Sequence, residues 1–109
     1  MKISYIENAL NLTRVTQNAA DASVESVYIG DILSLVLARA EENSIWLTVH
    51  GHMNILAVAK LKNVGAIIIC EETSPEDGVA SKADEENICV FTTQKSLYQT
   101  AKALAELGL

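Results

Sequence analysis

The sequence predicts a three-layer α/β domain, in which a mainly parallel sheet of four to five strands is covered by helices. Short apolar runs rich in β-branched residues alternate with helical patterns along the chain, an order typical of parallel sheets. These runs are continuously apolar rather than alternating, as expected for strands buried on both faces. The 109 residues fit a single domain, so we predict one domain over residues 1–109.

The first quarter of the chain is the least regular part. Ser4 is followed three residues later by Glu7, which matches the reciprocal capping pattern of a helix start, and we predict a short helix over residues 4–10. The stretch "NLTRVT", residues 11–16, is a possible edge strand. Residues 17–23 are small and polar and predict a loop.

From residue 24 onward the pattern is regular. Strands are predicted at "VESVYI", "SIWLTV", "GAIIIC" and "ICVFTT", and helices at residues 30–43, 52–63, 73–87 and 94–108. Asp31 is a candidate N-cap for the first of these helices. Ser74 is a candidate N-cap followed by Pro75 at the first helical position, where the missing N–H has no cost. Gly108 is expected to end the last helix.

Two predicted helices are more apolar than a surface helix should be. The segments "ILSLVLARA" and "MNILAVAKL" carry apolar residues around more than the roughly 100° stripe of a typical surface helix. A helix that is apolar nearly all round is covered on both sides. We therefore expect a homodimer, with the alternative that the helix over residues 4–10 folds over one of them.

The net charge of −6 is concentrated in one segment. Seven of the fourteen acidic residues lie between Glu71 and Glu86, against a single lysine. Nucleic acids and acidic membrane surfaces require a basic patch, so neither is an expected partner. The acidic segment is either a solvated helix face or a docking surface for a basic protein partner.

The two cysteines, Cys70 and Cys89, lie in apolar runs and form no C-x-x-C motif. They are expected to be reduced, which favours a cytoplasmic protein. The amino-terminal stretch lacks the apolar core of a signal peptide.

The strand-to-helix turns are the expected place for function, because ligands of open parallel sheets bind at the carboxyl ends of the strands. Helix N-termini and hydroxyl groups in these turns favour an anion or another small polar ligand. The candidate ligand-binding residues are Gly30, Asp31, His50, Gly51, His52, Asn54, Thr73, Ser74, Thr92 and Thr93.

Several roles are open to the only two histidines. His50 and His52 could bind a metal if Asp31, Glu71 or Glu72 supplied further ligands. A phosphoryl-accepting histidine would need nearby cationic or amide groups. In the remaining interpretations His50 ends a strand and His52 opens a helix, or His50 and Asn54 contact a ligand without chemistry. No nucleotide-binding glycine motif or nucleophile elbow is present, so we predict no catalytic residue, no metal and no cofactor.

Residues 27–70 resemble a stand-alone DRTGG domain. The resemblance rests on "GDILS", on "WLTVHGHMNILAVA", on the following "AIII", and on the spacing to "ICVFTT" and to the terminal "LAELGL". Its most specific part is the H-x-N-x-x-A-V-A run from His52 to Ala59. The Asp-Arg-Thr-Gly-Gly string that names the family is replaced by "VESVYIG". The motif positions that carry over are Gly30, Asp31, His52 and Asn54.

The resemblance implies a compact α/β fold similar to the N-terminal domain of HPr kinase/phosphorylase. DRTGG domains occur beside CBS modules in regulated pyrophosphatases and inside some phosphotransacetylases, and stand-alone members are similar to small proteins of anaerobic bacteria. The resemblance therefore implies a non-catalytic regulatory module that senses an adenine nucleotide or a similar phosphorylated molecule as a homodimer. The alternatives are an accessory subunit without a small ligand, and a histidine-dependent metal or phosphate enzyme.

Overall fold

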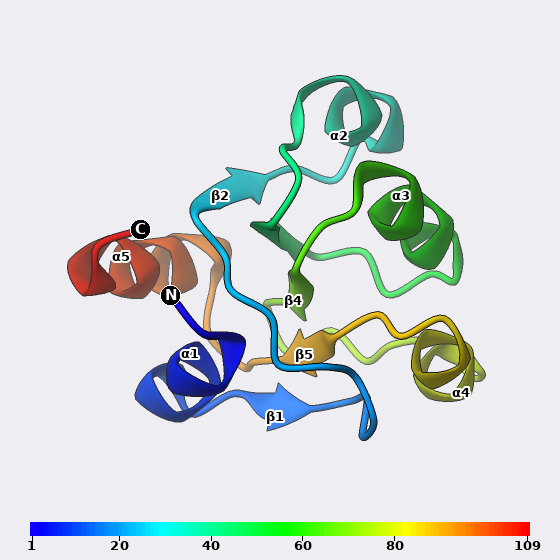
Figure 1. Cartoon of the computed structure of the whole chain (residues 1–109), viewed down its shortest axis with the longest axis horizontal. Coiled ribbons are helices and arrows are strands. Elements are labelled where there is room, and N and C mark those ends of the chain that lie inside the picture. The colour runs from blue at the N-terminus through cyan, green and yellow to red at the C-terminus, as the bar shows by residue number, and fades with distance from the viewer.

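The computed structural model describes all 109 residues and shows a five-stranded sheet between two layers of helices (Figure 1). The strand order is β1-β5-β4-β3-β2; β2 to β5 are parallel, and β1 is antiparallel to β5 at one edge. The predicted fold class is confirmed. The elements are α1 (Ile3–Leu10), β1 (Thr13–Arg14), β2 (Ser26–Ile29), α2 (Leu33–Arg39), β3 (Ser44–Thr48), α3 (Asn54–Lys62), β4 (Ala66–Ile69), α4 (Val79–Glu85), β5 (Val90–Thr92) and α5 (Leu97–Leu107).

The sheet separates two apolar cores. Helices α1 and α5 cover one face, and α2, α3 and α4 cover the other (Figure 1). Strand β3 shows the alternation: Ile45 and Leu47 join the α1/α5 core, while Trp46 joins the α2–α4 core. Every residue of β3 and β4 is buried, which explains their continuously apolar sequences.

The amino-terminal helix forms, but without its predicted cap. Lys2 occupies the N-cap position of α1 and makes no side-chain capping bond. Ser4 instead donates its hydroxyl to Asp21 at 2.7 Å, and Glu7 accepts from the Arg14 guanidinium of β1 at 2.8 Å. The capping-box prediction was wrong because both side chains have long-range partners. The predicted edge strand is confirmed as β1.

The predicted start of the fourth helix was also wrong. Helix α4 begins at Val79, after Gly78 at φ +93°, so Ser74 and Pro75 lie in an extended loop. This loop packs against the turn between β3 and α3. A Cβ on Gly51 of that turn would lie 2.6 Å from the Ser74 carbonyl oxygen. The tertiary contact therefore outweighs the local capping signal.

The two apolar helices lie on the same face of the sheet and remain exposed on their outer side. In α2 only Val36 is buried, whereas Leu35 and Leu37 are exposed; in α3, Leu61 is 76% exposed. Helix α1 packs on the opposite face, beside α5, so the alternative that it covers α2 or α3 is wrong. Helix α5 ends at Gly108 as predicted. None of the helices has the length and apolarity needed to span a bilayer.

Candidate functional site

A polar cleft lies at the carboxyl edge of the sheet, where the β4–α4 loop, the β5–α5 turn and β1 meet. Its volume is about 210 Å³ and none of its lining residues is hydrophobic. We call it the edge cleft; it is lined by Thr13, Glu72, Thr73, Ser74, Pro75, Thr92, Thr93 and Gln94. A second hollow of about 340 Å³ shares Thr13, Thr93 and Gln94 with it and adds Leu10, Asn11 and Lys95. Four of the ten predicted site residues, Thr73, Ser74, Thr92 and Thr93, are therefore brought together.

The wall of the edge cleft depends on an unusual backbone conformation. Glu71 and Glu72 are both left-handed, at φ 63° and 58°, which is unfavourable for consecutive non-glycine residues. Their N–H groups donate to the carbonyls of Lys95 and Thr93, and the Glu71 carboxylate accepts from the Leu97 N–H at 2.8 Å. These bonds hold the β4–α4 loop against the start of α5. Strain of this kind is often kept where a loop has a function.

The edge cleft offers mainly hydrogen-bonding groups. Four threonine side chains and that of Ser74 line it, and the N–H groups of Ser74 and Gln94 have no partner within the chain. Lys95 adds one positive charge at the adjoining hollow, while Glu72 places a carboxylate on the wall. This set suits a small polar ligand that is held by several hydrogen bonds and by one ion pair.

Gly30 and Asp31 lie at the same edge but have structural contacts. The Asp31 carboxylate accepts from the Thr48 hydroxyl at 2.7 Å and from the Val49 N–H at 2.8 Å. The Gly30 carbonyl accepts from Trp46 Nε1 at 2.8 Å. The prediction of Asp31 as an N-cap was wrong: Ile32 occupies that position of α2, and the carboxylate binds the end of β3 instead.

The β3–α3 turn, residues 49–53, holds both histidines, and we call it the histidine turn. None of its residues lines the edge cleft. The His50 N–H donates to Thr48 Oγ1, and His52 Nδ1 accepts from the Asn54 N–H at 3.1 Å, so His52 opens α3 as one interpretation predicted. His52 Nε2 lies 3.6 Å from Glu76 Oε2. Gly51, the residue between the histidines, packs on the Ser74 carbonyl. The histidine turn therefore supports the loop that lines the cleft.

The suggested metal ligands do not converge. The Asp31 and Glu71 carboxylates are bonded to backbone N–H groups of different turns. No group of three histidine, cysteine, aspartate or glutamate side chains lies close enough together to hold a metal ion.

Four lining residues were not among the predicted site residues: Thr13, Glu72, Gln94 and Pro75, the last of which was assigned to a helix start. Thr13 reaches the cleft because β1 pairs with β5, where Thr13 lies opposite Thr92. Glu72 and Gln94 belong to turns that were considered, but a glutamate or a glutamine in a turn carries no ligand signal by itself. The edge-strand pattern of residues 11–16 was the only signal that could have placed Thr13 here.

No protein-family model matches the chain, and no curated protein sequence matches it. A solved structure is similar: the CBS and DRTGG domains of the regulatory region of Clostridium perfringens pyrophosphatase, in complex with the activator diadenosine tetraphosphate. The TM-score is 0.71 at 15% sequence identity, over 94% of this chain and 45% of that chain. The chain therefore has a fold related to a part of that regulatory region, less than half of its length.

Proposed function

We propose that the chain is a DRTGG-like, non-catalytic regulatory module of the cytoplasm, and that it acts as a homodimer. Its ligand is an adenine nucleotide or a similar phosphorylated small molecule, bound in the edge cleft. The observation that carries the proposal is the cleft itself, a hollow of hydroxyl and backbone N–H groups with no hydrophobic lining residue.

The chemistry of the edge cleft supports a phosphorylated ligand. Hydroxyl and N–H groups bind phosphate oxygens, and Lys95 supplies charge-assisted bonds. The pyrophosphatase region with the related fold is a regulatory region bound to an adenine dinucleotide activator, which favours this ligand class over other anions.

A thermal-melt panel on the purified chain tests the proposal. The probes are AMP, ADP, ATP, diadenosine tetraphosphate, acetyl phosphate, pyrophosphate and inorganic phosphate. A ligand at ~100 times its Kd stabilises by about 2.7 kcal/mol, and 1 kcal/mol raises the Tm of such a domain by roughly 4–8 °C. We expect at least one nucleotide to raise the Tm by several degrees.

The variant for this panel is Ser74→Ala with Gln94→Ala, because neither side chain makes a hydrogen bond within the chain. It should keep the basal Tm and lose the nucleotide shift. His52→Ala, at the same edge but outside the cleft, is the control and should keep the shift. No shift with any probe would contradict the proposal, as would a shift that survives in the double variant.

A further inference from the structure

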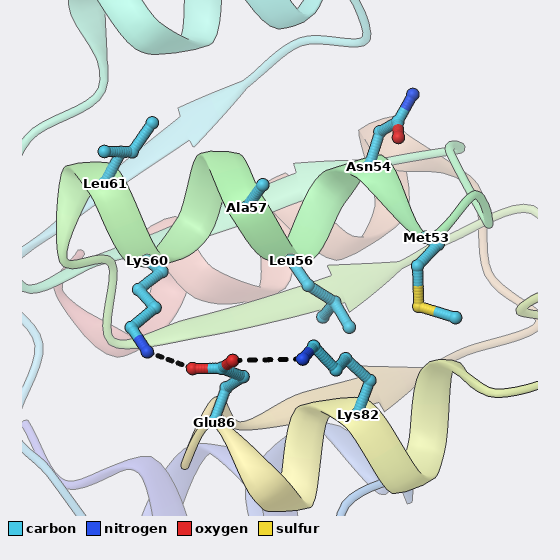
Figure 2. A pocket seen from close by; sticks show the side chains of 8 residues that line it. All are labelled: Met53, Asn54, Leu56, Ala57, Lys60, Leu61, Lys82 and Glu86. Carbon is cyan, nitrogen blue, oxygen red and sulfur yellow. Dashed lines mark hydrogen bonds and ion pairs between the residues drawn. The ribbon is translucent and has the colours of Figure 1, made fainter.

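The outer face of α3 carries a regular apolar stripe. Ala57 and Leu61 are four residues apart on one side of α3, and Met53 lies four residues before Ala57 at the N-cap position. A groove of about 490 Å³ lies between α3 and α4. Leu56 and Met53 point into it, while Ala57 and the exposed Leu61 lie along its upper rim (Figure 2). The stripe thus has a projecting leucine at one end and a small residue in the middle. The open part of the groove lies beside Met53 and Leu56, because the Lys60–Glu86–Lys82 ion pairs occupy its other end (Figure 2).

The two ends of the stripe also differ in charge. Lys60 and Lys62 lie in the last turn of α3, where Lys60 is ion-paired with Glu86 of α4 and Glu86 is also paired with Lys82. Glu76 lies at the first turn, where its carboxylate accepts from the Met53 N–H at 3.2 Å and remains 43% exposed. The carboxyl end of α3 is therefore basic, whereas its amino end lies beside the Glu76 carboxylate of the β4–α4 loop, so a second α3 in antiparallel orientation would place opposite charges at both ends.

We propose that two copies of the chain meet at this face, with α3 antiparallel to the α3 of the partner about a two-fold axis at Ala57. In such an isologous contact each residue pair occurs twice. Leu61 enters the groove beside the partner's Met53, and the lysine-bearing end of each α3 lies toward the end of the partner's α3 that Glu76 flanks. The alanines face each other, and their small size lets the two helices pack closely.

The size of the interface requires a contribution from α2. A stable interface buries about 800 Å² per partner, more than a nine-residue helix offers on one face. Helix α2 packs beside α3, exposes Leu35 and Leu37, and has no charged residue before Arg39. Helix α2 therefore adds apolar area to the contact without adding like charges between two chains of net charge −6.

This inference deepens the dimer named in the proposed function but does not depend on the ligand. The edge cleft is lined by residues of β1, β5, the β4–α4 loop and the β5–α5 turn, and by none of α2 or α3. The dimer and the melt panel can therefore fail separately. A dimer without a nucleotide shift would overturn only the ligand proposal, and a nucleotide shift in a monomer would overturn only the dimer.

Sedimentation equilibrium tests the assembly, with an expected mass of twice the chain mass of 11.8 kDa. Leu61→Asp should raise the dimer Kd by about tenfold or more, as for a central interface residue. Tyr98→Asp is the matched control, since Tyr98 is 74% exposed on α5 in the opposite layer, and should leave the Kd unchanged. A monomer at all concentrations, or equal effects of both variants, would overturn the proposal.

A cross-link tests the two-fold axis. Ala57→Cys should oxidise to a covalent dimer, because a residue on the axis brings its own copy within disulfide reach. Ala105→Cys is the control, because Ala105 is also exposed but lies on α5. It should run as a monomer in non-reducing denaturing gel electrophoresis. Cys70 and Cys89 are buried and do not compete. A dimer that forms normally but fails to cross-link through Cys at position 57 would place the interface elsewhere and overturn the antiparallel α3 contact.

Discussion

The Asp31 carboxylate lies 2.7 Å from the Thr48 hydroxyl and accepts a second hydrogen bond from the Val49 N–H. Asp31 follows β2 and Thr48 ends β3, so the pair joins two neighbouring strand-to-helix turns. Thr48 is fully buried and its oxygen also accepts from the His50 N–H. The pair therefore fixes the start of the histidine turn, against which the loop of the edge cleft packs.

Asp31→Ala should destabilise the fold, because it leaves a buried hydroxyl and an N–H without their acceptor. We expect a loss of about 1–3 kcal/mol in the free energy of unfolding. Urea denaturation measures it through the fluorescence of Trp46, the only tryptophan and fully buried. Asp77→Ala, an exposed carboxylate without a hydrogen bond, is the control. Equal urea midpoints for both variants would contradict a structural role for Asp31.

Gly51→Ala should disturb the edge cleft from a distance. Its added Cβ would lie 2.6 Å from the Ser74 carbonyl oxygen, which belongs to backbone and cannot rotate away. We expect a cost of about 1–3 kcal/mol and a weaker nucleotide shift in the melt panel. At Gly30 the nearest atom is on the Tyr28 ring at 3.0 Å, and a side chain can yield. Gly30→Ala should therefore cost less, and the opposite order would contradict the packing described.

Burial raises the pKa of the Cys89 thiol from its ordinary value of 9.0 to about 11. The unfolded chain therefore loses this proton at lower pH than the folded chain. The contribution to stability is complete below pH 9 and is lost as the pH rises to about 11. Its full size is roughly 2–3 kcal/mol.

Cys89→Ala should flatten the pH dependence of stability between pH 8 and 11, measured by urea denaturation at fixed pH values. Ile68→Val, a buried core change without a thiol, is the control; it should lower stability at every pH and keep the slope. An unchanged slope in Cys89→Ala would show that other groups cause the alkaline loss.

Strands were more predictable from the sequence than helix starts. Runs such as "AIII" in β4 are apolar because both faces of the sheet are covered, so burial leaves a direct mark on the sequence. The residue types that cap helices are a weaker signal, because a serine or aspartate side chain can also hydrogen-bond to residues far away in the chain. Ser4, Asp31 and Ser74 all resemble N-caps, but the first two bind distant residues and the third lies against Gly51.

The site was predictable only in outline, for a related reason. The rule that ligands bind at the carboxyl edge selected Thr73, Ser74, Thr92 and Thr93, which line one hollow in the structure. It could not separate them from His50 at the same edge, which lies outside the cleft. The path of the loop that lines the cleft depends on the left-handed pair Glu71 and Glu72, and no local pattern indicates two such residues without a glycine.

Glu72→Gly should raise both stability and affinity for an anion. Glycine adopts a φ of 58° without steric cost, so relief of the left-handed strain is expected to add about 1 kcal/mol to the free energy of unfolding. The change also removes the only carboxylate of the edge cleft, and with it a repulsion against phosphate. Glu72→Gln separates the two effects, because it removes the charge and keeps the strain. A phosphorylated ligand should bind more tightly to both variants in titration calorimetry, whereas the Tm should rise in the glycine variant alone. Weaker binding to Glu72→Gln would instead indicate that the carboxylate accepts a hydrogen bond from the ligand.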